Sequence, residues 1–126
     1  MIEVVPSANK NKPYMVTKTD SIILSNGDEM YIHAGYLTDY ASIPFLLKIF
    51  LNNVGKYRDG FICHDYLYNY RGYFIDPDLR HFKAVSRNWA DKEMRYQMQQ
   101  AGAKDWRIKA YYLAVRLFGW RGFGKI

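Results

Sequence analysis

Five ionisable side chains of this 126-residue chain stand where the sequence pattern predicts burial or a structured loop: Asp39, His64, Asp65, Arg87 and Asp91. One histidine with two or three carboxylates is an adequate ligand set for a divalent metal such as zinc. A metal with an open coordination position can activate water for hydrolysis. These residues therefore form a candidate catalytic site, in which His64, Asp39 and Asp91 are the candidate metal ligands.

Two other interpretations use the same side chains. His64 could act as a general base oriented by an aspartate, with Arg87 holding an anionic substrate. Alternatively, these side chains only stabilise the fold. In that case Asp39 caps a following helix, Asp91 forms a buried ion pair with Arg87, and His64 donates to a backbone carbonyl. The spacing matches no HExxH motif, cysteine-based zinc site, P-loop or dinucleotide fingerprint, so it does not decide between these interpretations.

A helix predicted over residues 56–70 positions the His–Asp pair. One stripe of this helix combines aromatic rings with that pair: Tyr57, Phe61, His64, Asp65 and Tyr68. Because the rest of the stripe is aromatic, it should face the core, where unsatisfied polar groups are costly. The single cysteine, Cys63, points about 100° away from His64 on a helix. We expect it to be a small buried hydrophobe rather than a nucleophile.

Two further helices are predicted over residues 86–101 and 104–118. Ser86 is the expected N-cap of the first, and Gly102 occupies the position after its end that favours glycine. Arg87 and Asp91 lie on its apolar face. The helix over 104–118 is apolar on two sides, so we expect it to be the most buried helix. The basic tail that follows it is expected at the surface.

The N-terminal part of the chain favours strands. Residues 2–36 are predicted to form a small antiparallel sheet, with Asn26-Gly27 as the turn of its firmest hairpin. Pro44 is suited to the first turn of a short helix that ends near residue 51, and residues 71–85 are predicted to be a long loop. The expected fold is one α+β domain over residues 1–126, with a small N-terminal antiparallel sheet followed by a bundle of about four helices.

Composition narrows the class of protein. Hydrophobic residues make up 49% and charged residues 24% of the chain, as in ordinary soluble globular proteins. The net charge of +6 comes without a run of five like charges, which makes nucleic acid a less favoured partner. The basic residues considered for it are Arg107, Lys109, Arg116, Arg121 and Lys125. No signal peptide is evident, and no apolar run is long enough for a membrane span.

Three blocks of the sequence resemble those of an uncharacterised family of phage and prophage proteins, domain of unknown function thirteen fifty-three. The blocks are LTDYASIP at 37–44, HDYLY at 64–68, and Ser86-Arg87 followed by Ala90-Asp91. The resemblance covers about residues 35 to 119. It departs at Tyr40, where glycine is usual, which places a bulky ring beside Asp39. The motif positions that it marks are Asp39, Ser42, His64, Asp65, Arg87 and Asp91.

The resemblance implies a tailed-phage or prophage origin, and the family has no established activity to transfer. Two hypotheses follow. The first is a small metal-assisted or His/Asp hydrolase, for example of cell-wall peptide. The second is a non-enzymatic phage structural component or host-factor-binding protein, in which the His/Asp/Arg cluster is structural. Either protein would be expected in the host cytoplasm or associated with the virion, with a phage or host protein as its partner.

Overall fold

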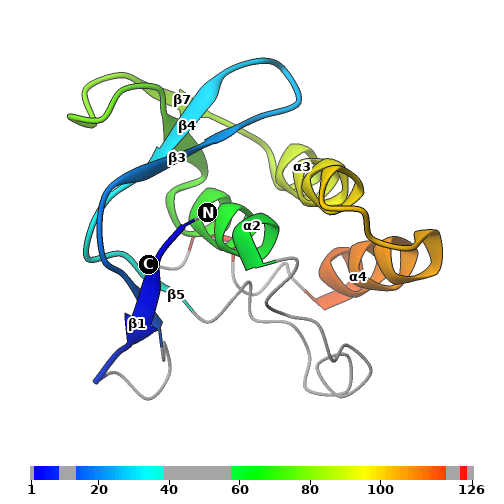
Figure 1. The fold of residues 1–126 in the computed structure, drawn as a ribbon. Coiled ribbons are helices and arrows are strands. Elements are labelled where there is room, and N and C mark those ends of the chain that lie inside the picture. Colours follow the sequence, from blue (N-terminus) through cyan, green and yellow to red (C-terminus); the bar gives the residue numbers. More distant parts are fainter. Residues whose placement is uncertain (1, 9–13, 39–57, 119–122, 125–126) are drawn as a thin grey trace.

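The described residues form two antiparallel sheets and three helices (Figure 1). The computed structural model describes residues 2–8, 14–38, 58–118 and 123–124. The first sheet has the strand order β1-β2-β5, with bounds Val4–Pro6, Tyr14–Val16 and Leu37–Thr38. The second has the order β3-β4-β6-β7, with bounds Asp20–Ile23, Glu29–Ile32, Gly72–Phe74 and Phe82–Ala84. The helices are α2 (Arg58–Tyr70), α3 (Arg87–Gln100) and α4 (Asp105–Phe118).

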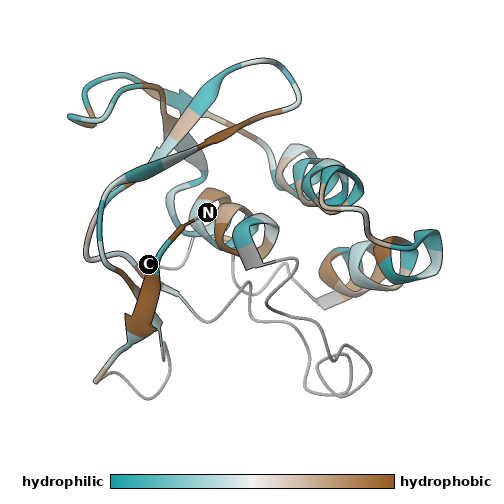
Figure 2. Ribbon diagram, viewed as in Figure 1, coloured by the Kyte–Doolittle hydropathy of each residue, from teal (hydrophilic) through white to brown (hydrophobic). Residues whose placement is uncertain are grey.

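Helix α2 lies between the strands and the other two helices (Figure 1). All residues from 60 to 69 are buried, so the helix is covered around its whole circumference rather than along one stripe. Hydrophobic and hydrophilic residues alternate along it, as the mixed colours of α2 show (Figure 2). The Phe61 ring contacts the Tyr111 ring of α4, with centroids 4.8 Å apart. Cys63 is buried and its Sγ lies 3.7 Å from the Met30 sulfur, as expected for a small core residue.

The prediction that the last helix is the most buried one was wrong. Helix α4 buries one face, which includes Ile108 and Tyr111. Its other apolar face remains open, since Trp106, Leu113 and Leu117 keep 55%, 58% and 57% of their surface exposed. The most buried helix is α2, because strands pack on one side of it and α3 packs on the other.

The predicted Asn26-Gly27 hairpin is confirmed as the turn between β3 and β4. Gly27 has a φ of +87°, a backbone conformation that glycine adopts without steric cost. Beside the turn, the buried carboxylate of Glu93 in α3 accepts hydrogen bonds from the Ser25 backbone at 3.1 Å and the Ser25 hydroxyl at 2.5 Å. The hairpin is therefore fixed to α3 as well as to its own sheet.

Both predicted ends of α3 are confirmed. The Ser86 hydroxyl accepts a hydrogen bond of 3.0 Å from the Trp89 backbone N–H, which satisfies one of the free donors of the first turn. At the other end Gly102 has a φ of +82° and donates its N–H to the Gln99 carbonyl at 3.0 Å. This is the left-handed residue with which many helices end.

Residues 71–85 are not a long loop, because they contain the antiparallel strands β6 and β7. A Cβ atom at Gly72 would lie 2.2 Å from the Lys83 carbonyl oxygen, so the close approach of the two backbones requires glycine. The pairing of Tyr31 with Phe74 joins this hairpin to β4. The strands are consequently not confined to the N-terminal part of the chain.

The α+β class is confirmed, with one correction to the predicted architecture. The described residues form two sheets rather than one, and they contain three of the about four predicted helices. The predicted helix over residues 44–51 lies outside the described residues. None of the described helices combines the length and apolar character needed to cross a membrane.

Part of the C-terminal tail contacts the core rather than standing free at the surface. Gly124 donates its N–H to the Tyr68 carbonyl at 2.7 Å. The Phe123 ring meets the Tyr68 ring edge-on, with centroids 5.3 Å apart. These contacts place residues 123–124 against the C-terminal end of α2, next to the side chains described below.

Replacing Ser86 by alanine should reduce the free energy of unfolding by about 1 kcal/mol, because the Trp89 N–H loses its partner. Chemical denaturation of the two proteins measures this difference. Asn88→Ala is the matched control, since Asn88 is exposed in the same helical turn and should change stability by less than about 0.5 kcal/mol. Equal effects of the two substitutions would contradict the capping role.

Candidate functional site

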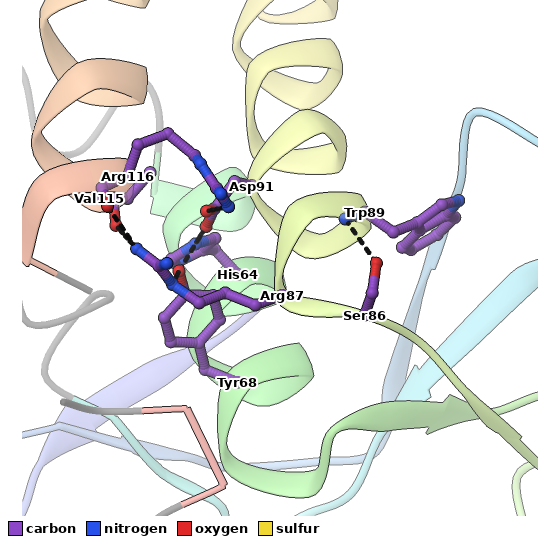
Figure 3. A network of polar contacts seen from close by, with 8 residues as sticks. All are labelled: His64, Tyr68, Ser86, Arg87, Trp89, Asp91, Val115 and Arg116. Carbon is purple, nitrogen blue, oxygen red and sulfur yellow. Dashed lines mark hydrogen bonds and ion pairs between the residues drawn. The ribbon is translucent and has the colours of Figure 1, made fainter. Parts of the chain in front are cut away.

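The Asp91 carboxylate is the centre of a buried network that joins α2, α3 and α4 (Figure 3). Asp91 is 0% exposed and His64 is 1% exposed. His64 Nε2 lies 2.8 Å from Asp91 Oδ1, and the Tyr68 hydroxyl donates a short hydrogen bond to the same oxygen. Arg116 Nη1 donates to Oδ2 at 2.7 Å. One carboxylate of α3 therefore accepts from two residues of α2 and one of α4.

These donors keep Asp91 ionised in the core. Burial alone would raise the pKa of the Asp91 carboxyl, but the hydrogen bonds from His64, Tyr68 and Arg116 outweigh it, and the pKa is lowered. Burial, together with the neighbouring Asp91, raises the pKa of the Tyr68 hydroxyl. Tyr68 consequently keeps its proton and remains a donor, and both carboxylate oxygens of Asp91 are occupied.

The negative charge on Asp91 determines which nitrogen of the His64 imidazole faces it with a proton. Because an ionised carboxylate only accepts hydrogen bonds, Nε2 must carry a proton. In the neutral ring the other nitrogen, Nδ1, then holds the lone pair. Nδ1 is buried and has no hydrogen-bond partner among the described residues. Among the described residues, it is the atom of this network that is left to bind a metal.

Arg87 does not pair with Asp91, so that part of the sequence interpretation was wrong. Its Nε donates to the Tyr68 oxygen at 3.2 Å. Its Nη2 donates to the carbonyl oxygens of Val115 at 2.7 Å and Arg116 at 2.5 Å. These carbonyls belong to the last turn of α4, where no intrahelical N–H can reach them. Arg87 thus caps the C-terminal end of α4, where a cation is also favoured by the helix dipole.

Asp65 belongs to a separate network on another side of α2. Its Oδ2 accepts a hydrogen bond of 3.0 Å from the Tyr36 hydroxyl, and Asn69 Nδ2 donates to the same hydroxyl at 2.6 Å. Burial, and then the charge of Asp65, raise the pKa of Tyr36. Adjacent residues of a helix point about 100° apart, so His64 and Asp65 face different neighbours. The structure brings His64, Arg87 and Asp91 together without Asp65, and Asp39 lies outside the described residues.

Comparison with known proteins identifies the family. A family model described as "Protein of unknown function (DUF1353)" matches residues 14–115. The chain belongs to this family. The match confirms the resemblance drawn from the sequence blocks, and it includes His64, Tyr68, Arg87 and Asp91. No curated protein and no solved structure matches this DUF1353 chain.

The described part of the DUF1353 chain does not assemble a metal site. No group of three or more histidine, cysteine, aspartate or glutamate side chains within it could hold a metal ion. Asp91 was predicted to be a ligand, but its two oxygens already accept hydrogen bonds from three donors. Its position fits instead the carboxylate that orients a histidine from behind. His64 Nδ1 is therefore the atom of this cluster that a metal could use.

Sequence reasoning missed two members of the network. Tyr68 was assigned to the aromatic stripe, although its position four residues after His64 places the two side chains on one helix face. Arg116 was considered for nucleic acid and not as a partner of Asp91. Its position in the last turn of an apolar helix could have indicated this role, because an arginine there can reach a buried carboxylate on the neighbouring helix. The pairing itself required the packing of α4 on α3.

Asp91→Asn should lower the free energy of unfolding by about 3–5 kcal/mol, because it removes the buried charge to which three side chains donate. Asp78→Asn is the matched control. Asp78 pairs with Arg80 at 2.7 Å, but both side chains are more than half exposed, so this change should cost less than about 1 kcal/mol. Urea denaturation at neutral pH measures both, and equal losses would contradict the central role of Asp91.

The stability difference between wild type and Asp91→Asn should depend on pH. Because folding lowers the pKa of Asp91, its ionised form adds stability that is complete above the ordinary aspartate pKa of about 3.9. That stability is lost as the pH falls through the lower pKa of the folded state. The stability gap between wild type and Asp91→Asn should therefore shrink below about pH 4. A gap that stays constant down to pH 2 would exclude this linkage.

Proposed function

We propose that this DUF1353 chain is a non-enzymatic phage or prophage protein that works by binding another protein chain through α4. The observation that carries this proposal is the exposed face of α4, where Trp106, Leu113 and Leu117 each keep more than half of their surface open. Single exposed apolar residues are ordinary. Three large ones in a row on one helix face are typical of an interaction surface.

The spacing explains why these residues form a row. Positions 106, 110, 113 and 117 follow the 4-3-4 pattern of one helix face. Ala110 is the fourth member, half-buried between Trp106 and Leu113. The opposite face packs against α3 and Phe61. The helix thus has two apolar faces, and the fold described here uses one of them.

The His64–Asp91 network supports this proposal because its hydrogen bonds hold the end of α4 in place. Arg116 and the two carbonyls capped by Arg87 lie in the last turns of α4, next to Leu117. The His64 and Asp91 side chains of this network are closed to solvent, at 1% and 0% exposure. Its hydrogen bonds fix the end of α4 so that the apolar row faces outward. The sequence blocks shared with the family then maintain a binding surface rather than a reaction centre.

The phage or prophage origin rests on the resemblance to the family, and the partner is a phage or host protein. Such a chain would act in the host cytoplasm or in the virion. The excess of basic residues gives weaker support to nucleic acid, because Arg116, one of the five basic residues considered for it, is already bound to Asp91.

One observation supports a second candidate function, that of a small hydrolase acting for example on cell-wall peptide. Nδ1 of His64 is buried without a partner among the described residues, and Asp91 orients the ring as it would for a general base or a metal ligand. Asp39 would be the further carboxylate of such a site. This candidate needs substrate to reach a side chain that is 1% exposed, which is why we place it second.

Complementation of a phage or prophage lacking the gene separates the two candidates. We expect Leu113→Glu to abolish complementation while the purified variant keeps its circular dichroism spectrum and melting temperature. Ile23→Glu is the matched control, since Ile23 on β3 is 59% exposed and Leu113 is 58% exposed. His64→Gln should still complement, because the Gln amide can donate to Asp91 in place of Nε2. A folded His64→Gln that fails, beside a Leu113→Glu that succeeds, would contradict the binding role and favour the hydrolase.

Elemental analysis addresses the metal directly. We expect the purified protein to contain less than about one-tenth of a zinc or other divalent ion per chain, because the described cluster offers one free ligand atom and structural sites use about four. One ion per chain, lost in His64→Gln with the fold intact, would overturn the non-enzymatic proposal. Loss of the same ion in Asp39→Asn would identify the second ligand.

A further inference from the structure

We infer that the chain bound by α4 is a second copy of this protein, packed with its own α4 antiparallel across a two-fold axis. This inference rests on the proposed function, because it names the partner of the same surface. In a two-fold contact each residue of one copy faces a symmetry-related position of the other. A row that forms such a contact must therefore be complementary to itself when it is reversed.

The apolar row of α4 meets this condition. With the axis midway between Ala110 and Leu113, Trp106 of one copy faces Leu117 of the other, and Ala110 faces Leu113. Each pair has the same sum of positions, so all four contacts form in a single register. The shape is self-complementary as well, because the small Ala110 lies opposite Leu113 and leaves room for that side chain.

Residue sizes favour the antiparallel arrangement over a parallel one. A parallel pair would place Trp106 against Trp106 in one layer and Ala110 against Ala110 in the next, which leaves one layer crowded and the next underfilled. The antiparallel pair puts one larger and one smaller residue in every layer. Even filling of layers is what close packing requires.

Charges beside the row point the same way. Asp105 lies in the first turn of α4 and Arg116 in the last turn, and both belong to the flank that borders Leu113. In the antiparallel register, Asp105 of each copy comes beside Arg116 of the other. Arg116 is 34% exposed and uses Nη1 for Asp91, so it retains donors for a second carboxylate. Lys109 lies on this flank too. In this register it does not lie opposite Lys109 of the other copy, because the two lysines are offset along the helix axis.

The size of the contact sets the expected strength. A helix pair that meets along three turns buries less than the roughly 1,200–2,000 Å² of a standard stable interface. The dimer should therefore be reversible, with monomer and dimer in measurable exchange at micromolar concentrations. Antiparallel helix dipoles add a small favourable term.

Sedimentation velocity over a series of concentrations tests this inference. Wild type should move from a species of 14.9 kDa toward one of twice that mass as its concentration rises. Leu113→Glu should weaken the dimer at least about 100-fold, because a two-fold contact carries the unpaired charge twice. Ile23→Glu should sediment as wild type. A monomer at every concentration, or a dimer that Leu113→Glu leaves unchanged, would overturn the inference.

Cysteine cross-linking tests the direction of the helices. Native Cys63 is 0% exposed and will not compete. An equimolar mixture of Ala110→Cys and Leu113→Cys proteins should form the mixed disulfide dimer in preference to either homodimer, whereas a parallel pair would give the two homodimers. The complementation result separates failure of the dimer from failure of the proposed function. If wild type is monomeric but Leu113→Glu still fails to complement, α4 binds a different partner and the proposed function stands. If Leu113→Glu complements, both the dimer and the proposed function are contradicted.

Discussion

A single buried negative charge organises the helical half of this molecule. The Asp91 carboxylate has no exposed surface, and it remains ionised because donors from α2 and α4 surround it. Isolated charges are costly in a protein interior, and removing any one donor would leave part of that cost without compensation. The positions of His64, Tyr68 and Arg116 are therefore mutually dependent. Arg87 extends the dependence to the backbone of α4, since it joins the Tyr68 hydroxyl to the last helical carbonyls.

Helix α2 supplies the other half of this arrangement. Because it is buried on all sides, successive residues serve different neighbours: His64 faces the helices, whereas Asp65 reaches Tyr36 next to β5. The HDYLY block thus combines two polar networks with apolar packing in little more than one helical turn. Its unusual composition follows from its place between two layers of the fold.

The sequence predicted the local features that depend on neighbouring residues. The Asn26-Gly27 turn, the Ser86 cap and the Gly102 terminus follow from backbone preferences, and all three are present. The sequence also indicated that His64, Arg87 and Asp91 are unusual for an apolar face. It could not indicate which arginine meets Asp91, because that depends on how α4 packs against α3. Strands β6 and β7 were missed because each has three residues, and the close approach that needs Gly72 appears only when the strands pair.

The cap that Arg87 provides also bears on how the molecule comes apart. Helix α4 shares an apolar cluster with α2 and α3, and its C-terminal carbonyls are held by a residue at the first position of α3. Releasing that end would leave the Asp91 charge without Arg116 and open the core around Tyr68 to water. The last turn of a helix ordinarily frays at low cost. Here it is coupled to the buried charge of Asp91, so the end of α4 should open together with the helical core as one cooperative unit.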